Sequence, residues 1–315
     1  MKKINIVACL DKDYVMPVGV MMYSVCYNNQ NIEIVFHIIA DESVKEKDKV
    51  DLTNTASRFG GKYVMFYSID RNKVSKFPDL IDGPSFATYY RLFLTEILPD
   101  SIDKVIYLDG DVVVRKSLLS LWQSDIENYA VAAVPDISPE DIYSCERLKY
   151  DSRLGYFNAG VLLINLRYWR EHNVIERFCE YIMTNYNSIH LQDQDVLNYV
   201  FREEKYMLPY KYNYQQNLVT KKYYYYNINA VLEACKDPIV LHFSGYNKPW
   251  NSYKATYNPY NSSFYKYQNQ TIWKGLTIDR RSLKLKVKNH VAKVLRKMRI
   301  KSTIRYVDIQ PVDKI

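Results

Sequence analysis

The N-terminal part of the chain alternates between short apolar runs and longer segments whose apolar residues recur at helical spacing. The apolar runs predict buried strands over residues 4–10, 32–39 and 63–67, and the segments between them predict helices over 14–27 and 41–59. This strand-helix-strand-helix-strand order predicts a parallel sheet with right-handed crossovers. Ligands of such sheets bind beyond the carboxyl ends of the strands.

The rest of the chain continues the α/β pattern less regularly. Strands are predicted over residues 104–114, where two acids interrupt the run, and over 130–134, 157–166 and 239–243. Helices are predicted over 85–98, 168–186 and 193–201, whereas residues 245–274 are aromatic and irregular. We therefore expect an α/β fold with a mostly parallel central sheet flanked by helices.

Composition is that of a folded globular protein. Hydrophobic residues make up 48% and charged residues 25%, and no apolar run approaches the roughly 18 residues of a membrane-spanning helix. The five cysteines are scattered without a CxxC pair, which is typical of a reduced cytoplasmic protein. The first apolar stretch ends at Asp11, which is too early for a secretory signal, so we expect a cytoplasmic location.

Positive charge is concentrated near the C-terminus. The net charge is +8, and residues 280–301 hold ten basic residues and no acidic one, which leaves 33 basic against 35 acidic residues elsewhere. We therefore divide the chain into a near-neutral domain, residues 1–278, and a basic tail, residues 279–315. A near-neutral domain without a basic stripe argues against nucleic acid as a partner.

The tail has the pattern of an amphipathic helix. Apolar residues recur at helical spacing, with basic residues between or beside them. The apolar residues are Val287, Val291, Val294, Leu295 and Met298. Such a helix is typical of one that lies in an anionic membrane surface. We expect peripheral attachment to the inner face of the cell membrane; the alternative is a helix packed on the domain with a solvated basic face.

Two carboxylates, Asp109 and Asp111, stand at the end of the buried run KVIYL, separated only by Gly110. Buried carboxylates need a partner, and hard oxygen ligands suit Mg²⁺ or Mn²⁺, which often bridges to substrate phosphates. A small residue between the acids would let a diphosphate come close. The alternative is a solvated turn, because Asp-Gly is a common turn dipeptide.

His242 strengthens the metal interpretation. It lies inside the apolar strand IVLHF and opens a loop that contains Gly245 and Lys248. The loop backbone could approach a phosphate and the lysine could neutralise it. A metal held by Asp109, Asp111 and His242 is chemically coherent, although a lone histidine on a strand is more often a core residue.

Four further residues could contact a sugar. Asp193 and Gln194 offer a carboxylate and a carboxamide at a helix start, where the alternative is an ordinary N-terminal acid. Asn158 interrupts an apolar strand together with Gly160, which indicates a bend or a close ligand. Arg91 is a single cation on an apolar, aromatic segment, where the alternative is a surface arginine. No GxGxxG, P-loop or GxSxG motif occurs.

Together these motifs resemble glycosyltransferase family 8, the family of bacterial lipopolysaccharide galactosyl- and glucosyltransferases and of glycogenin. The resemblance covers about residues 4–250, and the bacterial branch is the more similar. The motifs stand in the family's order at residues 8–14, 88–92 (TYYRL), 107–111 (YLDGD), 156–165 (YFNAGVLLIN), 192–197 (QDQDVL) and 242–250 (HFSGYNKPW).

The resemblance implies a GT-A fold, a UDP-hexose donor, Mn²⁺ or Mg²⁺, and transfer with retention of anomeric configuration. It implies residue roles position by position. These are Asp109, Asp111 and His242 for the metal; Asp11 and Tyr14 for uridine; Gly110, Gly245 and Lys248 for the diphosphate; Arg91, Asn158, Asp193 and Gln194 for the donor sugar; and Asp136 for the acceptor.

The function expected from the resemblance is transfer of glucose or galactose to a saccharide or lipid-linked oligosaccharide acceptor of lipopolysaccharide or another cell-surface glycan. Gln194, the residue that resembles the one below the anomeric carbon, is a poor nucleophile, which favours same-face substitution; Asp193 is the alternative nucleophile. The competing functions are a non-catalytic nucleotide-sugar-binding protein and a metal-dependent nucleotidyltransferase. Retained metal ligands argue against the first, and the lack of a Gly-rich basic N-terminal loop argues against the second.

Overall fold

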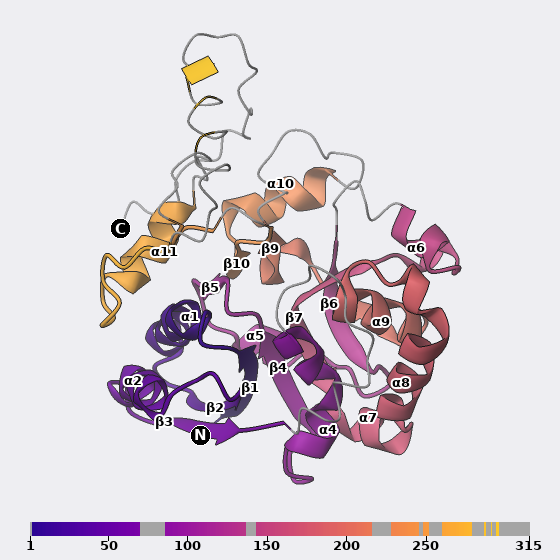
Figure 1. The fold of residues 1–315 in the computed structure, drawn as a ribbon, viewed down its shortest axis with the longest axis horizontal. Coiled ribbons are helices and arrows are strands. Elements are labelled where there is room, and N and C mark those ends of the chain that lie inside the picture. The colour runs from indigo at the N-terminus through magenta and orange to yellow at the C-terminus, as the bar shows by residue number, and fades with distance from the viewer. Residues whose placement is uncertain are drawn as a thin grey trace.

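The computed structural model describes residues 2–69, 86–136, 143–215, 228–245, 248–251 and 260–278, together with residues 287, 291, 294 and 295. Its main element is a mixed seven-stranded sheet with helices on both faces, and a three-stranded sheet lies beside it (Figure 1). The mostly parallel α/β architecture expected from the sequence is confirmed, since four of the six strand pairs of the large sheet are parallel.

The N-terminal part has the predicted βαβαβ order. Strands β1 (Lys3–Leu10), β2 (Glu33–Ala40) and β3 (Lys62–Tyr67) pair in parallel, and helices α1 (Val15–Asn28) and α2 (Glu46–Ser57) connect them. Helix α2 begins later than predicted. Asp41 instead accepts the backbone N–H of Ser43 in a turn, and the Asp48 side chain accepts the N–H of Lys45 at the helix start.

The other half of the large sheet is mixed. Strand β4 (Lys104–Leu108) pairs with β1, and β7 (Phe157–Asn165), β6 (Val131–Pro135) and β8 (Lys205–Met207) follow in that order. Strand β7 is antiparallel to both of its neighbours, and all nine of its residues are buried. Its near-continuous apolar run, which predicted a strand, is explained by this burial on both faces.

The predicted single strand over residues 104–114 is wrong. After β4 the chain turns at Asp109-Gly110-Asp111 and enters β5 (Val112–Val114), which belongs to the small sheet with β10 (Val240–His242) and β9 (Tyr214–Gln215). Strand β10 is antiparallel to β5 and parallel to β9. The two acids therefore lie at the transition between the two sheets.

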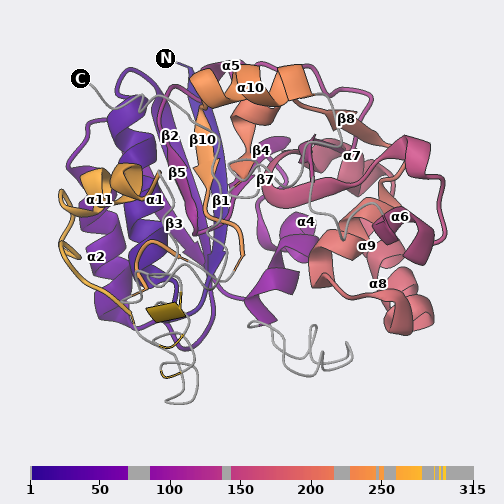
Figure 2. The same ribbon diagram turned by 90° about the horizontal axis from the view of Figure 1, so that it is seen from above.

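Alternating residues of the large sheet belong to two separate cores. Ile106 and Leu108 of β4 pack in the cluster that contains α1, α2 and the small sheet. Val105 and Tyr107 of the same strand face the other cluster, beneath α7 (Leu166–Glu171), α8 (Val174–Asn185) and α9 (Gln192–Val200). Figure 2 shows α1, α2 and α11 on one side of the molecule and α6, α8 and α9 on the other.

Two predicted helices differ in kind from the observed elements. Residues 85–98 were expected to form one helix, but η1 (Phe86–Phe93) is a 3₁₀-helix followed by one turn of α-helix, α4 (Leu94–Ile97). The predicted helix over 168–186 is divided into α7 and α8 at Asn173, whose φ of 47° is left-handed. Helix α9 agrees with the predicted helix over 193–201.

Several elements were not predicted. Helix α11 (Asn261–Gln268) lies in the aromatic, irregular region, and no element was predicted for the segment that forms α10 (Ile228–Lys236). The other elements are short: α5 (Leu119–Trp122), α6 (Ser144–Arg147), η3 (Ser152–Leu154), η4 (Tyr186–Ser188) and η5 (Tyr210–Tyr212). Trp273, which follows α11, lies against Gly19 of α1, where a Cβ would be 2.0 Å from the indole. Gly19 thus permits the C-terminal part of the domain to pack on α1.

Most of the predicted tail, residues 279–315, lies outside the described residues. Its four described members, residues 287, 291, 294 and 295, are helical, and Val287, Val291 and Val294 are exposed. Met298 is not among them.

Candidate active site

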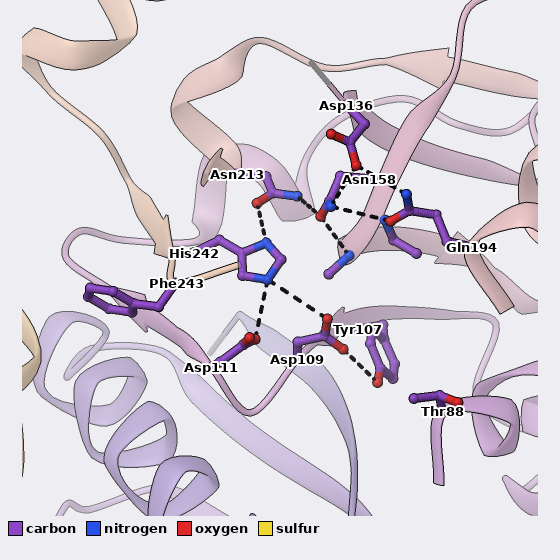
Figure 3. Close-up of polar contacts among 12 residues, drawn as sticks. Thr88, Tyr107, Asp109, Asp111, Asp136, Asn158, Gln194, Asn213, His242 and Phe243 are labelled. Atoms are coloured by element: carbon purple, nitrogen blue, oxygen red, sulfur yellow. Dashed lines mark hydrogen bonds and ion pairs between the residues drawn. The ribbon is translucent and has the colours of Figure 1, made fainter. Parts of the chain in front are cut away.

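Three predicted metal ligands come together where the two sheets meet. Asp109 follows β4, Asp111 precedes β5, and His242 ends β10, whose pairing with β5 places His242 beside Val112. One ligand atom from each of the three side chains lies within 4.8 Å of the others (Figure 3). Nε2 of His242 is 3.2 Å from Oδ1 of Asp111 and 4.0 Å from Oδ2 of Asp109.

The donor set fits a divalent cation. Nδ1 of His242 lies 3.0 Å from Oδ1 of Asn213, an atom that only accepts, so in the neutral imidazole Nδ1 carries the proton and Nε2 presents its lone pair. Oδ1 of Asp111 is buried, and no hydrogen-bond donor within the described ranges satisfies it. A lone pair and carboxylate oxygens facing one another repel, and a cation between them removes the repulsion. Two carboxylates and an imidazole suit Mn²⁺ or Mg²⁺.

Asp111 is held in its charged form. Burial opposes ionisation, but the neighbouring Lys248 ammonium lowers the pKa of the carboxyl well below its ordinary value. The Lys248 ammonium donates to Oδ2 of Asp111 and, over 2.8 Å, to the carbonyl oxygen of Phe243. Gly245, in the same loop, has a φ of 83°, which explains a glycine at that position.

Arg91 is buried, so the interpretation as a surface arginine is wrong. Its guanidinium donates to Oδ1 of Asp109 at 2.9 Å and to the carbonyl oxygen of Ala159 at 2.8 Å. Its Nε lies 3.0 Å from Oδ2 of Asp193, and its plane lies over the ring of Tyr107, 4.2 Å from the centroid. Arg91 therefore orients Asp109 and joins the metal cluster to the start of α9.

Asp193 is not a solvated helix-start acid, because only 5% of it is exposed. Burial raises the pKa of its carboxyl to about 7, against the opposing effect of Arg91. Its neighbour Asp195 is completely buried and accepts two hydrogen bonds from Arg147, at 2.8 and 2.9 Å, and one from the hydroxyl of Tyr156 at 2.7 Å. Asp195 thus fixes the helix start, whereas Asp193 faces the site.

Gln194 is held by four hydrogen bonds. Its Oε1 accepts from the backbone N–H of Ala159 at 3.0 Å and from Nδ2 of Asn158 at 3.3 Å. Its Nε2 donates to Oδ2 of Asp136 at 3.1 Å and to the hydroxyl of Tyr156 at 3.2 Å. Asn158 also donates to Asp136, at 3.0 Å, so the predicted sugar and acceptor residues form one polar cluster (Figure 3).

Of the predicted uridine residues, Tyr14 lies against Gly110, between the two acids of the metal cluster. Asp11 and Tyr14 occupy the turn between β1 and α1, and the Tyr14 ring contacts Trp250 edge-on at 6.2 Å. A Cβ on Gly110 would lie 2.9 Å from the Tyr14 ring and 2.8 Å from Val18. Gly110 is therefore small because α1 packs against it, a reason that the sequence did not indicate.

Sequence reasoning missed the residues that orient the others. Tyr107 supports Asp109 with a hydroxyl 3.1 Å from its Oδ1, Tyr156 supports Gln194, and Asn213 supports His242. Gly160 was noticed only as a break in a strand. Its Cβ would lie 2.3 Å from Cε1 of His242, so it provides the space for the imidazole. Tyr107 and Tyr156 open the motifs at residues 107–111 and 156–165, although no role was predicted for them, whereas no motif contains Asn213.

The mixed sheet and the site at its carboxyl edge define a glycosyltransferase of the GT-A fold. The chain belongs to glycosyl transferase family 8, whose model matches residues 5–254. The resemblance noted in the sequence is thereby confirmed.

Three similar proteins illustrate the family. General stress protein A of Bacillus subtilis is 31% identical over 281 residues, which are 85% of this chain and 94% of that protein. A lipopolysaccharide 1,2-glucosyltransferase of Escherichia coli is 28% identical over 253 residues, 78% of this chain and 72% of that protein. The crystal structure of galactosyltransferase LgtC with donor and acceptor sugar analogues matches with a TM-score of 0.75 at 27% identity, covering 88% of this chain and 98% of LgtC.

Within the part of the chain that the structure describes, no helix combines the length and the apolar character needed to cross a membrane.

Proposed function

We propose that the protein transfers glucose or galactose from a UDP-sugar to a saccharide acceptor of lipopolysaccharide or another cell-surface glycan, with retention of configuration and dependence on Mn²⁺ or Mg²⁺. The observation that carries the proposal is the cluster of Asp109, Asp111 and His242 with an Nε2 lone pair turned toward two carboxylates. The glucosyl- and galactosyltransferases among the similar proteins support a hexose donor of either kind.

Each residue has a proposed role in binding the donor. Asp109, Asp111 and His242 hold the metal, which supplies Lewis acidity at the leaving diphosphate when bound. Lys248 and the backbone of Gly245 balance the charge of the diphosphate, with Gly110 alongside. Asp11 and Tyr14 bind the uridine. Arg91, Asn158, Asp193 and Gln194 surround the hexose, and Asp136 faces the acceptor.

We propose same-face substitution for the transfer step. The acceptor oxygen bonds to the anomeric carbon as the bond to the phosphate breaks, and the departing phosphate takes the acceptor proton. The hydrogen bonds of Gln194 support this, because its amide oxygen already accepts two and has no lone pair left for attack. The ion pair of Asp193 with Arg91 likewise weakens Asp193 as a nucleophile. A glycosyl adduct on either residue, found by mass spectrometry, would overturn the mechanism.

The test is release of UDP from UDP-glucose or UDP-galactose with and without Mn²⁺. Wild-type protein should release UDP slowly by hydrolysis and faster with an acceptor, and chelation should stop both. Asp109→Asn and Asp111→Asn keep the side-chain volume but remove a charged ligand, and each should lower the rate by at least about 10²-fold. Metal-dependent UDP binding without turnover would indicate a non-catalytic binding protein. Release of diphosphate from UTP and a sugar phosphate would indicate a nucleotidyltransferase.

We further propose that residues 279–315 attach the catalytic domain, residues 1–278, to the anionic inner face of the cell membrane, where a lipid-linked acceptor resides. Ten basic residues within 280–301 supply the charge. The helical, exposed Val287, Val291 and Val294 support an apolar stripe that could enter the membrane interface. The near-neutral domain gives no reason to expect nucleic acid as a partner.

A further inference from the structure

Asn213 is completely buried next to the candidate metal cluster. It follows η5 and directly precedes β9, whose Gln215 pairs with His242 of β10. The parallel pairing of these two short strands brings Asn213 to the side of the His242 ring that faces away from Asp109 and Asp111 (Figure 3).

The Asn213 amide is used at both ends. Its Oδ1 lies 3.0 Å from Nδ1 of His242, and its Nδ2 donates to Oδ1 of Asn158 at 2.8 Å. Asn158 in turn donates to Asp136 and Gln194. One buried carboxamide therefore connects the metal cluster to the cluster proposed to surround the hexose.

We propose that Asn213 is a positioning residue that keeps His242 in the tautomer with Nε2 unprotonated and, with the same amide, fixes the orientation of Asn158. The inference rests on the proposed function for the meaning of both clusters. A partner on the second nitrogen of a ligating histidine sets the ring orientation and tautomer, and its loss typically costs about 10–100-fold in metal affinity.

Only a carboxamide meets both requirements at this position. A leucine of similar volume neither accepts from Nδ1 nor donates to Asn158. An aspartate still accepts from Nδ1 of His242, but it meets Oδ1 of Asn158 with an oxygen, and two acceptors repel. Asn213→Leu and Asn213→Asp therefore separate the two roles.

The first test measures Mn²⁺ affinity by EPR on the folded full-length protein, together with kcat and KM for the UDP-sugar. Asn213→Leu should weaken Mn²⁺ binding about 10–100-fold and lower turnover. Asn213→Asp should bind Mn²⁺ with an affinity within about threefold of wild type, because the acceptor for Nδ1 is retained. Its kcat should fall about 10-fold, because Asn158 is displaced. Equal loss of Mn²⁺ affinity in both variants would refute the assigned hydrogen bond to His242.

The second test reads the tautomer directly and needs neither metal nor turnover. In ¹⁵N-histidine-labelled, metal-free protein, the His242 signals, assigned with His242→Asn, should show a protonated Nδ1. Asn213→Asp should keep this pattern, and Asn213→Leu should shift the ring toward the opposite tautomer. An unchanged tautomer in a folded Asn213→Leu protein would overturn the proposal.

Asn29 provides a matched control. It is also buried, and its amide accepts the backbone N–H of Leu118 and donates to the carbonyl of Val25, both outside the site. Asn29→Leu should lower the melting temperature without changing Mn²⁺ affinity or the His242 tautomer. If wild-type protein binds no Mn²⁺, the proposed metal dependence fails, whereas the tautomer test of Asn213 still gives its own answer.

Discussion

Gly160 is a glycine because His242 occupies the space in which its side chain would lie. A Cβ there would be 2.3 Å from Cε1 of His242, 2.8 Å from its Nδ1 and 2.9 Å from Oδ2 of Asp109. The imidazole cannot move easily, because its Nδ1 is bound to the buried Asn213. The residue type at a position of the site therefore depends on the space available there as well as on charge.

Gly160→Ala should weaken Mn²⁺ binding by about 10–100-fold, since the imidazole or the Asp109 carboxylate must move. Calorimetric titration of the folded variant measures this. Gly60→Ala is the matched control: its Cβ would meet no atom of the described residues within 4 Å, and its Mn²⁺ affinity should equal that of wild type. Wild-type affinity in Gly160→Ala would show that the site tolerates the extra methyl group.

At the scale of elements, helix α9 delivers Asp193 and Gln194 to the site because Asp195 anchors its first turn. Besides Arg147 and Tyr156, the Asp195 carboxylate accepts the backbone N–H groups of His190 and Leu191, each at 2.7 Å. A buried carboxylate with this many charge-assisted bonds is fully satisfied. The segment before α9 and the helix itself are thereby held against β7.

Asp195→Asn should destabilise the domain by about 3 kcal/mol, because the half-buried Arg147 loses its counter-charge at a completely buried site and an amide group faces two backbone donors. Urea unfolding followed by far-UV circular dichroism measures the change. Asp151→Asn removes the exposed Asp151–Arg153 ion pair but keeps an oxygen to accept the backbone N–H of Arg153, so it should leave the free energy of unfolding unchanged. Equal stability of the two variants would contradict the anchoring role.

The three parallel N-terminal strands enclose a histidine that should make the domain acid-sensitive. His37 of β2 is buried, with Nδ1 3.0 Å from the Tyr67 hydroxyl and Nε2 3.3 Å from Oδ1 of Asn5. Burial, together with the positive charge of Lys3, lowers the pKa of His37 to about 4. Its ordinary value is 6.5.

Between about pH 6.5 and pH 4, His37 is protonated in the unfolded chain but neutral in the folded protein. Lowering the pH over this interval therefore decreases the free energy of unfolding by about 2–3 kcal/mol. His37→Gln should remove this loss. The measurement is the wild-type minus variant stability at pH 7 and pH 4, which cancels the other titrating groups. A difference that does not change with pH would contradict the lowered pKa.

At the scale of the whole molecule, the described residues that precede the tail pack on the rest of the chain. Ile278 bonds through its backbone N–H to the carbonyl of Trp250 at 2.8 Å and bridges to Asn251, while Trp273 packs on α1. A cut after Asp279 keeps these contacts. Truncation at this position therefore tests the proposed division into a catalytic domain and a basic tail.

Truncation after Asp279 should leave UDP and Mn²⁺ binding unchanged, raise solubility and abolish binding to anionic vesicles. Basic residues near an anionic leaflet contribute roughly 1 kcal/mol each, so full-length protein should sediment with phosphatidylserine vesicles at low salt and be released at high salt. Phosphatidylcholine vesicles are the control. Full-length protein that ignores anionic vesicles, or a truncated domain that unfolds, would indicate a structural tail.

The sequence by itself determined the parallel β1–β2–β3 unit and strand β7. It also predicted that Asp109, Asp111 and His242 come together as a cluster. A strand that is buried on both faces needs a near-continuous apolar run, and a buried carboxylate needs a partner. Both requirements are visible in the local order of residues. The sequence did not distinguish β4 from β5, because Val112 to Val114 extend the apolar pattern of β4 although they join another sheet.

Only the tertiary structure decided which residues orient the site. Arg91 matched both a surface and a site residue in the sequence, and its burial against Asp109, Asp193 and Tyr107 excludes the surface alternative. Asn213 had no signal at all, because its role depends on a hydrogen bond to a residue 29 positions away. Contacts of this kind arise from the pairing of β9 with β10, and no local pattern of hydrophobic and polar residues encodes them.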